Sequence, residues 1–312
     1  MDGMVAVSIV VPCYNAAGFI AEGIASVQQQ TFADWECLVV DDCSTDNSAA
    51  LVQDLARSDP RIIPIQQERN GGAAVARNAA IEAARGTWLT LLDADDLYAP
   101  DRLARLLSLA EANGADMVFD NQAISDFPSA RQVDRAFHWL DGDAVPFTSE
   151  EFFARSSEFG RSINPGYMKP LFRKSFVDAH HLRYDPEFRS GQDFLFYANA
   201  FAHEPTCFAT GYCGYVYRRR AGSLSRSGGQ HLRNHARLSD EILARHGSRL
   251  AAGSKQALLR RKAHFSRAAA LHEARLALSE HGILAALKSV IASPSAIAAA
   301  LTALRRRLLS KA

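Results

Sequence analysis

The chain has 312 residues, 48% of them hydrophobic and 22% charged, which is ordinary for a globular protein and enough for one large or two smaller domains. No stretch reaches about 18 apolar residues, so the sequence predicts no membrane-spanning helix. The net charge of +1 is unevenly distributed, because residues 255–312 hold 11 basic and two acidic residues while the rest of the chain is acidic. A basic tail on an acidic body indicates an anionic surface as the partner of the tail.

The first 120 residues alternate between two hydrophobic periods. Short β-branched runs predict strands, and longer amphipathic stretches between them predict helices. The predicted strands are residues 5–12, 36–42, 61–67, 87–93 and 115–121, and the predicted helices are residues 18–30, 48–57, 72–86, 100–113. Strand and helix in turn predict an α/β fold with a mostly parallel, Rossmann-like sheet and helices on both faces.

The alternation stops near residue 121. Residues 149–156, 173–180 and 192–203 have helical patterns, and residues 206–219 (TCFATGYCGYVYRR) have the composition of a short hairpin. From about residue 229 onward the pattern is helical. We therefore expect three segments, residues 1–120, 121–228 and a helical C-terminal extension over 229–312.

The cysteines and the N-terminus indicate a cytoplasmic protein. The five cysteines are odd in number and have no metal-ligand spacing, so we expect a reducing compartment and no disulfide framework. The N-terminal stretch MDGMVAVSIVVP has an acid at position 2 and no basic segment before its apolar run, so we expect no signal peptide.

Polar clusters follow three of the predicted strands: PCYN (12–15), DDCSTDN (41–47) and DADD (93–96). Because ligands of such sheets bind beyond the carboxyl ends of the strands, we expect the clusters to meet at one rim. In the last cluster, Asp93 and Asp95 alternate and therefore point to the same side. A hard divalent cation completed by phosphate oxygens would suit two such carboxylates. The alternative is a solvated turn, with Asp96 capping the next helix.

Two further stretches lie near the same rim. Asp41 and Asp42 end an apolar strand, where an acid can accept hydrogen bonds from a base N–H or a ribose hydroxyl; the alternative is that they only begin a loop. The loop Asn70–Gly72 lacks the glycine pattern of a dinucleotide fold and the Gly-Lys of a P-loop, so a phosphate site is weakly indicated. Arg77, inside the following helix, can turn toward the acidic rim and offset its charge.

The segments VSIVVPCYN, VVDDCSTDNS and NGGAAVARNAAIEAARGTWLTLLDADD, in this order over residues 7–96, closely resemble family 2 of the glycosyltransferases, which have the GT-A fold. The resemblance implies an inverting transferase that uses a nucleotide-sugar and Mg²⁺ or Mn²⁺. It implies that residues 1–120 bind the nucleotide-sugar, that residues 121–228 hold the acceptor and the catalytic base, and that residues 229–312 are an extension. The residues that the resemblance places around the nucleotide-sugar are Pro12, Tyr14, Asn15, Asp41, Asp42, Arg77, Asp93 and Ala94. It makes Asp95 the direct metal ligand, with Asp93 the second acid of the metal site and turned toward the ribose, and Asp96 a third member of the acidic cluster.

The second half supplies the base by the same resemblance. EFRSGQDFLFYANAF (187–201) is similar to the Glu-Asp segment of the family, in which the Asp is the base, and Asp193 matches. Gln192 departs from the usual Glu, which puts the tuning of the base in doubt. The alternative is that Asp193 only caps the helix. In YVYRRRAGSLSRSGG (215–229), Arg218 or Arg220 is expected on the donor diphosphate, unless the segment is a solvated basic loop.

The family's processive synthases carry Gln-x-x-Arg-Trp here, whereas this chain has QHLRN (230–234), so we expect one sugar to be added per encounter. ADMVFDNQ and LRYDPEFRSGQDFLF are similar to bacterial enzymes that build succinoglycan-type exopolysaccharide on a lipid carrier. The tail, residues 281–312, has two apolar stripes separated by Pro294 and five basic residues. It either lies on an anionic membrane, near a polyprenyl-diphosphate-linked acceptor at the inner face of the cytoplasmic membrane, or packs on the catalytic domain.

The sequence thus favours a metal-dependent inverting hexosyltransferase that moves one sugar, expected from UDP-glucose or UDP-galactose, to a saccharide or lipid-linked saccharide. The rival hypothesis is a protein that binds a sugar nucleotide on the same fold without catalysis. A nucleotidyltransferase is weaker, because PCYNAAG has no basic residue to bind phosphate. We expect no nucleic-acid partner.

Overall fold

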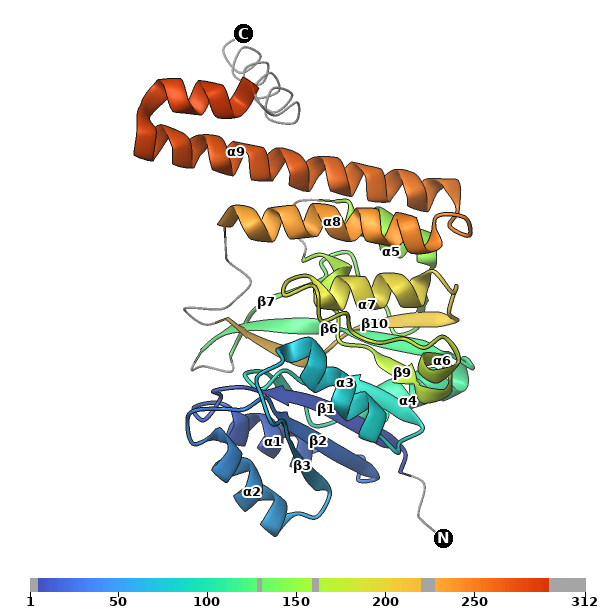
Figure 1. Ribbon diagram of the computed structural model, residues 1–312. Helices are drawn as coiled ribbons and strands as arrows, with labels where there is room; N and C mark the ends of the chain where they lie inside the picture. Colours follow the sequence, from blue (N-terminus) through green and yellow to red (C-terminus); the bar gives the residue numbers. More distant parts are fainter. Residues whose placement is uncertain (1–4, 128–130, 159–162, 220–227, 292–312) are drawn as a thin grey trace. The chain divides into compact units, whose positions relative to one another are not determined.

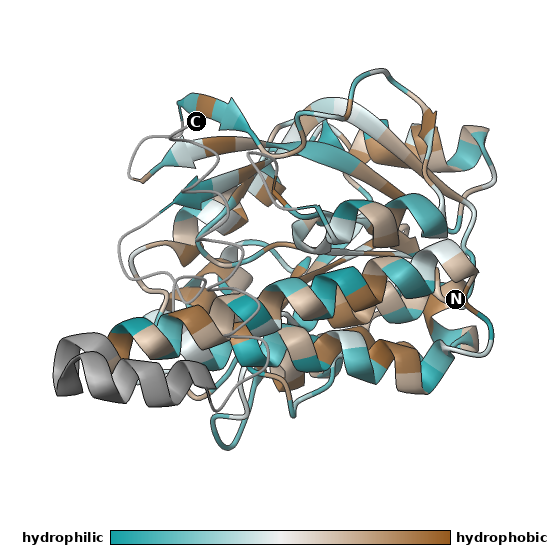
Figure 2. Ribbon diagram, turned by 90° about the horizontal axis from the view of Figure 1, so that it is seen from above, coloured by the Kyte–Doolittle hydropathy of each residue, from teal (hydrophilic) through white to brown (hydrophobic). Residues whose placement is uncertain are grey.

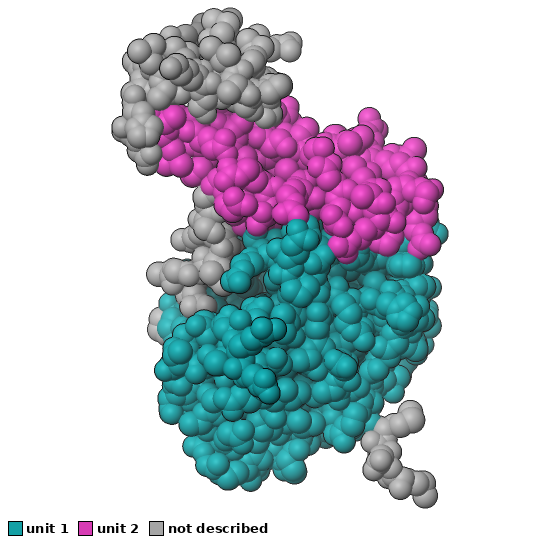
Figure 3. All heavy atoms as spheres, in the orientation of Figure 1, with its two compact units in different colours: residues 1–152, 159–221 teal, residues 153–158, 222–312 magenta. Residues whose placement is uncertain are grey.

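The computed structural model describes residues 5–127, 131–158, 163–219 and 228–291 (Figure 1). The chain divides into two compact units (Figure 3). Unit 1 consists of residues 1–152 and 159–221, and unit 2 consists of residues 153–158 and 222–312. All the described strands belong to unit 1.

Unit 1 is built around one sheet with the strand order β3-β2-β1-β4-β9-β6-β10-β5. The strands on this path are β1 (Val7–Cys13), β2 (Trp35–Asp41), β3 (Ile62–Gln66), β4 (Trp88–Leu91), β5 (Leu97–Tyr98), β6 (Met117–Asp126), β9 (Leu171–Arg173) and β10 (Cys207–Arg219). Two short strands extend it, since β7 (Gln132–Arg135) pairs with β6 and β8 (Val145–Pro146) pairs with β10.

The sheet is mostly parallel and flanked by helices (Figure 1). β1 is parallel to β2 and β4, β2 is parallel to β3, and β6 is parallel to β10. β9 is the exception at the centre, because it runs antiparallel to both β4 and β6. The helices of unit 1 are α1 (Ile20–Gln28), α2 (Ser48–Ser58), α3 (Ala73–Ala83), α4 (Arg102–Ala112), α6 (Lys174–Ala179) and α7 (Gln192–Phe201), with a 3₁₀ turn η1 (Pro165–Tyr167); α5 (Ser149–Ser156) crosses the division between the units. The predicted α/β fold is therefore confirmed.

The strands form where the sequence has β-branched runs that are covered on both faces. Every residue of β2 is buried, as are all residues of β1 except Pro12. From α1, the apolar side chains of Ile20, Ile24 and Val27 pack into the same core with no exposed surface. Because full burial of such a side chain is worth about 1.5–3 kcal/mol, this cluster fixes the sheet whose rim holds the polar loops.

The prediction of a hairpin over residues 206–219 is wrong. The segment is one 13-residue strand, β10, which is parallel to β6 along its length. Gly211 and Gly214 lie at irregularities of the pairing, since the register shifts between Thr210 and Cys213 and again between Cys213 and Tyr215. A Cβ atom at Gly214 would come within 2.4 Å of Asp120 Oδ2, so glycine is required there for the strands to approach.

Unit 2 contains two long helices, α8 (Gly228–His246) and α9 (Ala252–Ile291). Hydrophobic and hydrophilic residues are mixed along both helices (Figure 2). Leu238, Ile242 and Leu258 are buried, and Lys262 pairs with Asp240 at 2.7 Å. No described helix is long and apolar enough to cross a membrane. Of the predicted tail stripes, the one that follows Pro294 lies outside the described residues.

Candidate active site

The carboxylate of Asp93 lies just beyond β4 and is bonded to two cations. Its Oδ1 accepts a hydrogen bond from Arg77 Nη2 at 2.8 Å, and its Oδ2 accepts one from Lys169 Nζ at 2.7 Å. Burial alone would raise the pKa of Asp93, but Lys169 and Arg77 outweigh it and hold this pKa well below its ordinary value. Asp93 is therefore ionised and fixed in direction.

The same two cations reach Asp193, at the start of α7. Lys169 Nζ donates to Asp193 Oδ2 at 2.8 Å, and Arg77 Nη1 lies 3.1 Å from Asp193 Oδ1. Arg77, Asp93, Lys169 and Asp193 thus form a closed ring of alternating charge, which we call the charge ring. The two cationic side chains are only 9% and 6% exposed, whereas Asp93 is 26% and Asp193 is 14% exposed. Paired opposite charges with hydrogen bonds offset the cost of removing them from water.

Arg77 is placed in the ring by α3 and its neighbours. The helix is rich in alanine, and Ala74, Ala76 and Ala80 are buried, so α3 lies close to the sheet. The ring of Tyr184 lies 5.0 Å from the Arg77 guanidinium. Burial would lower the pKa of Arg77, but Asp193 and Asp93 hold it well above its ordinary value. The guanidinium therefore stays charged.

The loop between β4 and β5 is tied to the end of β10. Asp96 is buried, and its carboxylate accepts hydrogen bonds from Tyr215 Oη at 2.6 Å and from the backbone N–H of Arg218 at 2.8 Å. Burial, together with the nearby Asp95 and Asp93, raises the pKa of Asp96 well above its ordinary value. The alternative in which Asp96 caps the next helix is wrong, because α4 begins only at Arg102 and the Asp96 carboxylate instead bonds to Tyr215 and Arg218 of β10.

Arg218 also supports this loop. Its Nε donates to the carbonyl oxygen of Asp95 at 2.6 Å, and its Nη1 pairs with Glu22 of α1. The side chain is 1% exposed, so the structure places it against the protein rather than in a solvated loop. Arg220 lies outside the described residues.

Asp42 and Asp41 have different surroundings, although they are adjacent at the end of β2. Asp42 accepts hydrogen bonds from the N–H groups of Gly71 at 2.8 Å and Gly72 at 2.7 Å, so both its oxygens hold the loop before α3. Gly72 has a φ of 85°, which favours glycine. Asp41 is 4% exposed, and only its Oδ2 accepts a hydrogen bond, from Ser44 N at 3.1 Å. Its buried Oδ1 has no hydrogen-bond partner among the described residues.

The segment after β1 lies beside the segment after β2. Asn15 has a φ of 47° and accepts a hydrogen bond from Thr45 N at 2.8 Å, while its own N–H donates to Ser44 Oγ at 3.0 Å. Tyr14 is 50% exposed. Its ring is therefore accessible to solvent at the same rim as Asp41.

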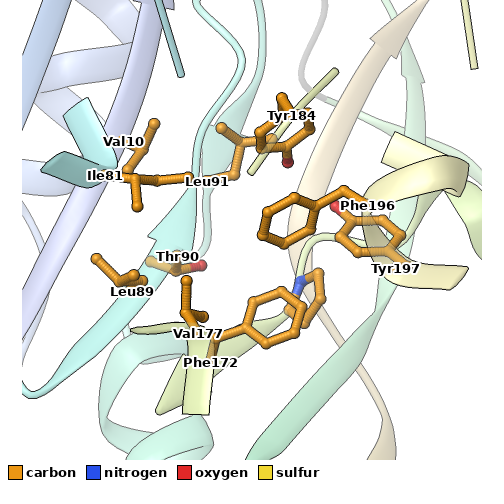
Figure 4. A pocket seen from close by; sticks show the side chains of 11 residues that line it. Val10, Ile81, Leu89, Thr90, Leu91, Phe172, Val177, Tyr184, Phe196 and Tyr197 are labelled. Carbon is orange, nitrogen blue, oxygen red and sulfur yellow. The ribbon is translucent and has the colours of Figure 1, made fainter. Parts of the chain in front are cut away.

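Unit 1 has an apolar cavity, which is lined in part by Tyr184 (Figure 4). Its volume is about 30 Å³. Aliphatic side chains of β1, α3 and β4 face aromatic rings of Tyr184 and of α7 across it (Figure 4). The lining residues are Val10, Ile81, Leu89, Thr90, Leu91, Pro170, Phe172, Val177, Tyr184, Phe196 and Tyr197. Because Tyr184 lines the cavity and also covers Arg77, the Arg77 side of the charge ring faces apolar surroundings, where ion pairs are stronger than in water.

Among the described residues, no group of three or more His, Cys, Asp or Glu side chains is placed to hold a metal ion. Both oxygens of Asp93 already bond to cations, and Asp95 lies two residues further along the same partly exposed loop. A site with one carboxylate fits a hard divalent ion only when a phosphate-bearing ligand completes its coordination. The residues present therefore fit a metal that arrives with a diphosphate.

Comparison with known proteins identifies the family. The family model described as "Glycosyl transferase family 2" matches residues 8–178.

The chain belongs to glycosyl transferase family 2. The matched residues include Arg77, Asp93 and Lys169 and end before Asp193. The resemblance seen in residues 7–96 is thereby confirmed.

The relatives of this chain include proteins named for succinoglycan biosynthesis. The chain is 39% identical over 227 residues to the succinoglycan biosynthesis protein ExoO of Rhizobium meliloti, and the matched region covers 72% of this chain and 64% of ExoO. It is 34% identical over 270 residues to ExoU of the same organism, covering 83% of this chain and 75% of ExoU. A shorter match, 41% over 118 residues, links 38% of this chain to 46% of the UDP-Glc:alpha-D-GlcNAc-diphosphoundecaprenol beta-1,3-glucosyltransferase WfgD of Escherichia coli.

Solved structures of glycosyltransferases share the fold. Staphylococcus aureus TarS in complex with UDP-GlcNAc has a TM-score of 0.63 at 21% identity, covering 88% of this chain and 73% of that chain. The mannosyltransferase PcManGT of Pyrobaculum calidifontis, in complex with GDP-Man and Mn²⁺, has a TM-score of 0.57 at 19% identity, covering 98% and 81%. The GT-A architecture predicted for this family 2 member is confirmed.

The structure brings most of the predicted residues to one rim. Pro12, Tyr14, Asn15, Asp41 and Asp42 lie at the ends of β1 and β2, and Arg77, Asp93, Ala94, Asp95, Asp193 and Arg218 lie at the charge ring or on the loop tied to it. Their individual roles stay predictions. The sequence analysis missed Lys169, whose only signal is a lysine followed by a proline before a short apolar run.

Proposed function

We propose that this family 2 member is an inverting glycosyltransferase that transfers one sugar per encounter from a nucleotide-diphosphate sugar to a saccharide acceptor. The observation that carries the proposal is the charge ring, in which Arg77 and Lys169 join Asp93 at the donor rim to Asp193 at the start of α7. Inversion requires a donor site and a base on opposite faces of one sugar carbon. The charge ring supports the proposal because it holds the donor-side carboxylate Asp93 and a second carboxylate, Asp193, at fixed positions close to each other.

We assign the nucleotide to the rim formed by β1 and β2. The unpartnered Oδ1 of Asp41 is a buried acceptor suited to an N–H group of a nucleobase, because a buried acceptor without a partner is costly. Tyr14 offers an exposed ring beside it. Uracil has one N–H that a single carboxylate oxygen can accept, so UDP-glucose and UDP-galactose are the first donors to test.

We assign Mg²⁺ or Mn²⁺ to Asp95 together with the donor diphosphate, and we place Asp93 on the ribose side. When bound, the ion stabilises the negative charge that develops on the leaving diphosphate. Arg218 holds the carbonyl of Asp95 and thereby fixes the loop. Asp193 accepts the proton of the acceptor hydroxyl. The hydroxyl oxygen of the acceptor forms a bond to the sugar C1 while the bond from C1 to the diphosphate oxygen breaks.

We propose a polyprenyl-diphosphate-linked saccharide as the acceptor, in the synthesis of an exopolysaccharide or another surface glycan. The activity of WfgD, whose acceptor is a diphosphoundecaprenol-linked sugar, supports this choice, as do the biosynthetic roles named for ExoO and ExoU. The basic tail would then bring the enzyme to the membrane that carries the acceptor.

The test begins with donor binding. UDP-glucose, UDP-galactose and UDP-GlcNAc are each added with and without Mn²⁺, and melting temperature and released UDP are measured. Asp193→Asn is expected to keep donor affinity within about threefold while UDP release falls about 10²–10⁴-fold, the range for loss of a general base. Asp178→Asn is the matched control, because Asp178 is 43% exposed and pairs only with Lys174 among the ion pairs of the described residues.

Equal turnover by Asp193→Asn and the wild type would remove Asp193 as the base. Donor binding by the wild type without turnover, with glycan acceptors present, would instead support the rival hypothesis of a non-catalytic binding protein. Failure to bind any donor would overturn the proposal.

A further inference from the structure

Lys169 occupies a position that the topology of the sheet determines. It lies between η1 and β9, and β9 runs antiparallel to β4, with Leu89 opposite Phe172. The residues just before β9 therefore lie beside the residues just after β4. This register brings the ammonium group to Asp93, 76 residues earlier in the chain.

The backbone of Lys169 is held from a second direction. Its carbonyl oxygen accepts a hydrogen bond of 2.5 Å from Nη2 of Arg102, on α4. Arg102 is itself fixed by Asp120, with bonds of 2.8 and 2.9 Å, and neither side chain is exposed. Pro170 further restricts Lys169 to an extended backbone. This buried support distinguishes Lys169 from a surface lysine that pairs with whichever acid is near.

The ammonium is committed to two carboxylates at once. Its bonds of 2.7 Å to Asp93 Oδ2 and 2.8 Å to Asp193 Oδ2 limit the distance between those oxygens to the sum of the two lengths. Burial would lower the pKa of Lys169, but Asp193 and Asp93 hold it well above its ordinary value, so the group stays charged. Arg77 joins the same two carboxylates less directly, because it donates a hydrogen bond to Asp93 Oδ1, whereas Asp193 Oδ1 lies 3.1 Å from Arg77 Nη1 without accepting a hydrogen bond.

We propose that Lys169 is a positioning residue that fixes the base Asp193 relative to the donor-side carboxylate Asp93. The inference rests on the proposed function. Lys169 does not touch the substrate; it sets the direction in which Asp193 presents its carboxylate to the acceptor hydroxyl. Since misplacement of a reacting group by about 1 Å costs about 10²-fold in rate, loss of the ammonium should lower turnover far more than donor affinity.

The test compares Lys169→Met, Lys169→Arg and the control Lys174→Met in the full chain. Lys174 is the matched control because it lies nearby on α6 and pairs with Asp178 at 2.6 Å, but is 26% exposed. With UDP-glucose and Mn²⁺, Lys169→Met is expected to lower kcat for UDP release about 100-fold and to change the Kd for UDP less than about threefold. Lys169→Arg, which keeps the charge, should recover at least tenfold of that loss. Lys174→Met should match the wild type.

A second variant separates positioning from folding. Lys169→Met leaves two carboxylates with one cation, and it can reduce the amount of folded protein. Lys169→Met combined with Asp193→Asn keeps the ring balanced, with Arg77 opposite Asp93. If Lys169 acts through Asp193, the double variant should have the same residual rate as Asp193→Asn alone, within about threefold, because residues acting as a unit are not additive.

The outcomes distinguish the two proposals. The role of Lys169 is overturned if Lys169→Met keeps turnover within threefold of the wild type. It is also overturned if Lys169→Met lowers turnover by the same factor in the Asp193→Asn background as in the wild type. Either result leaves the proposed function standing. Absence of UDP release from every donor by the wild type overturns the proposed function and this inference with it.

Discussion

Arg218 donates a hydrogen bond of 2.6 Å from its Nε to the backbone carbonyl of Asp95, although the two residues are 123 positions apart. The bond ties the end of β10 to the loop that holds the proposed metal ligand. The Arg218 side chain is 1% exposed and its guanidinium also pairs with Glu22, so it supports the loop from inside the protein. The strength of metal and diphosphate binding should therefore depend on a residue that need not contact either ligand.

We expect Arg218→Met to weaken Mn²⁺-dependent UDP binding about tenfold or more, since a hydrogen bond from a charged donor is worth about 1.5–3 kcal/mol. Isothermal titration with Mn²⁺ and UDP gives the affinity. The adjacent Arg219 is the control, because it is 46% exposed and pairs with Asp126 at the surface. An Arg219→Met variant with the same loss would show that the effect is one of net charge.

Asp41 and Asp42 allow a separation of binding from stability. Asp41→Asn should lower UDP affinity about tenfold, because an amide is a weaker acceptor for a base N–H than a carboxylate, and it should leave the free energy of unfolding nearly unchanged. Asp42→Asn should lower the free energy of unfolding and leave UDP affinity nearly unchanged. Its amide NH₂ would face an N–H of Gly71 or Gly72, which costs about 1–3 kcal/mol of stability. Titration calorimetry and urea unfolding of both variants measure the two effects, and an exchange of the two outcomes would contradict the assignment.

The fold could be predicted because its strands are local features. β1 and β2 are buried on both faces and are therefore continuous apolar runs in the sequence, and the polar segments after them lie where parallel strands end. Asp41 and Asp93 could be found for the same reason. Each follows its strand directly, so its place at the rim needs no knowledge of distant contacts.

The missed features depend on pairings between distant segments. Lys169 meets Asp93 only because β9 enters the sheet antiparallel beside β4, which no local pattern indicates. The same holds for Asp96, whose partners Tyr215 and Arg218 come from β10. Short strands with few residues, such as β9, have too little periodicity to be recognised.

Unit 2 holds a histidine in surroundings that forbid its charged form. His235 is buried on α8, its ring stacks on Phe265 at 4.7 Å, and Arg261 Nη2 lies 2.8 Å from its Nδ1. Since a guanidinium only donates, Nδ1 is the acceptor and the proton resides on Nε2. Burial, Arg261 and the neighbouring His231 lower the pKa of His235 to about 2.

This lowered pKa predicts that acid destabilises the protein. Above the pKa of about 6.5 in the unfolded state, His235 is neutral in both states and its full contribution to the free energy of unfolding is present. Below this pKa the unfolded state binds a proton, whereas the folded state does not bind one until about pH 2. The free energy of unfolding therefore falls as the pH falls. The free energy of unfolding should therefore drop by about 1.4 kcal/mol per pH unit between pH 6 and pH 5 from this residue alone. His235→Asn keeps an acceptor for Arg261 but takes up no proton, so urea unfolding between pH 7.5 and pH 5 should show a shallower loss than the wild type. Equal slopes for His235→Asn and the wild type would mean that His235 is not held neutral.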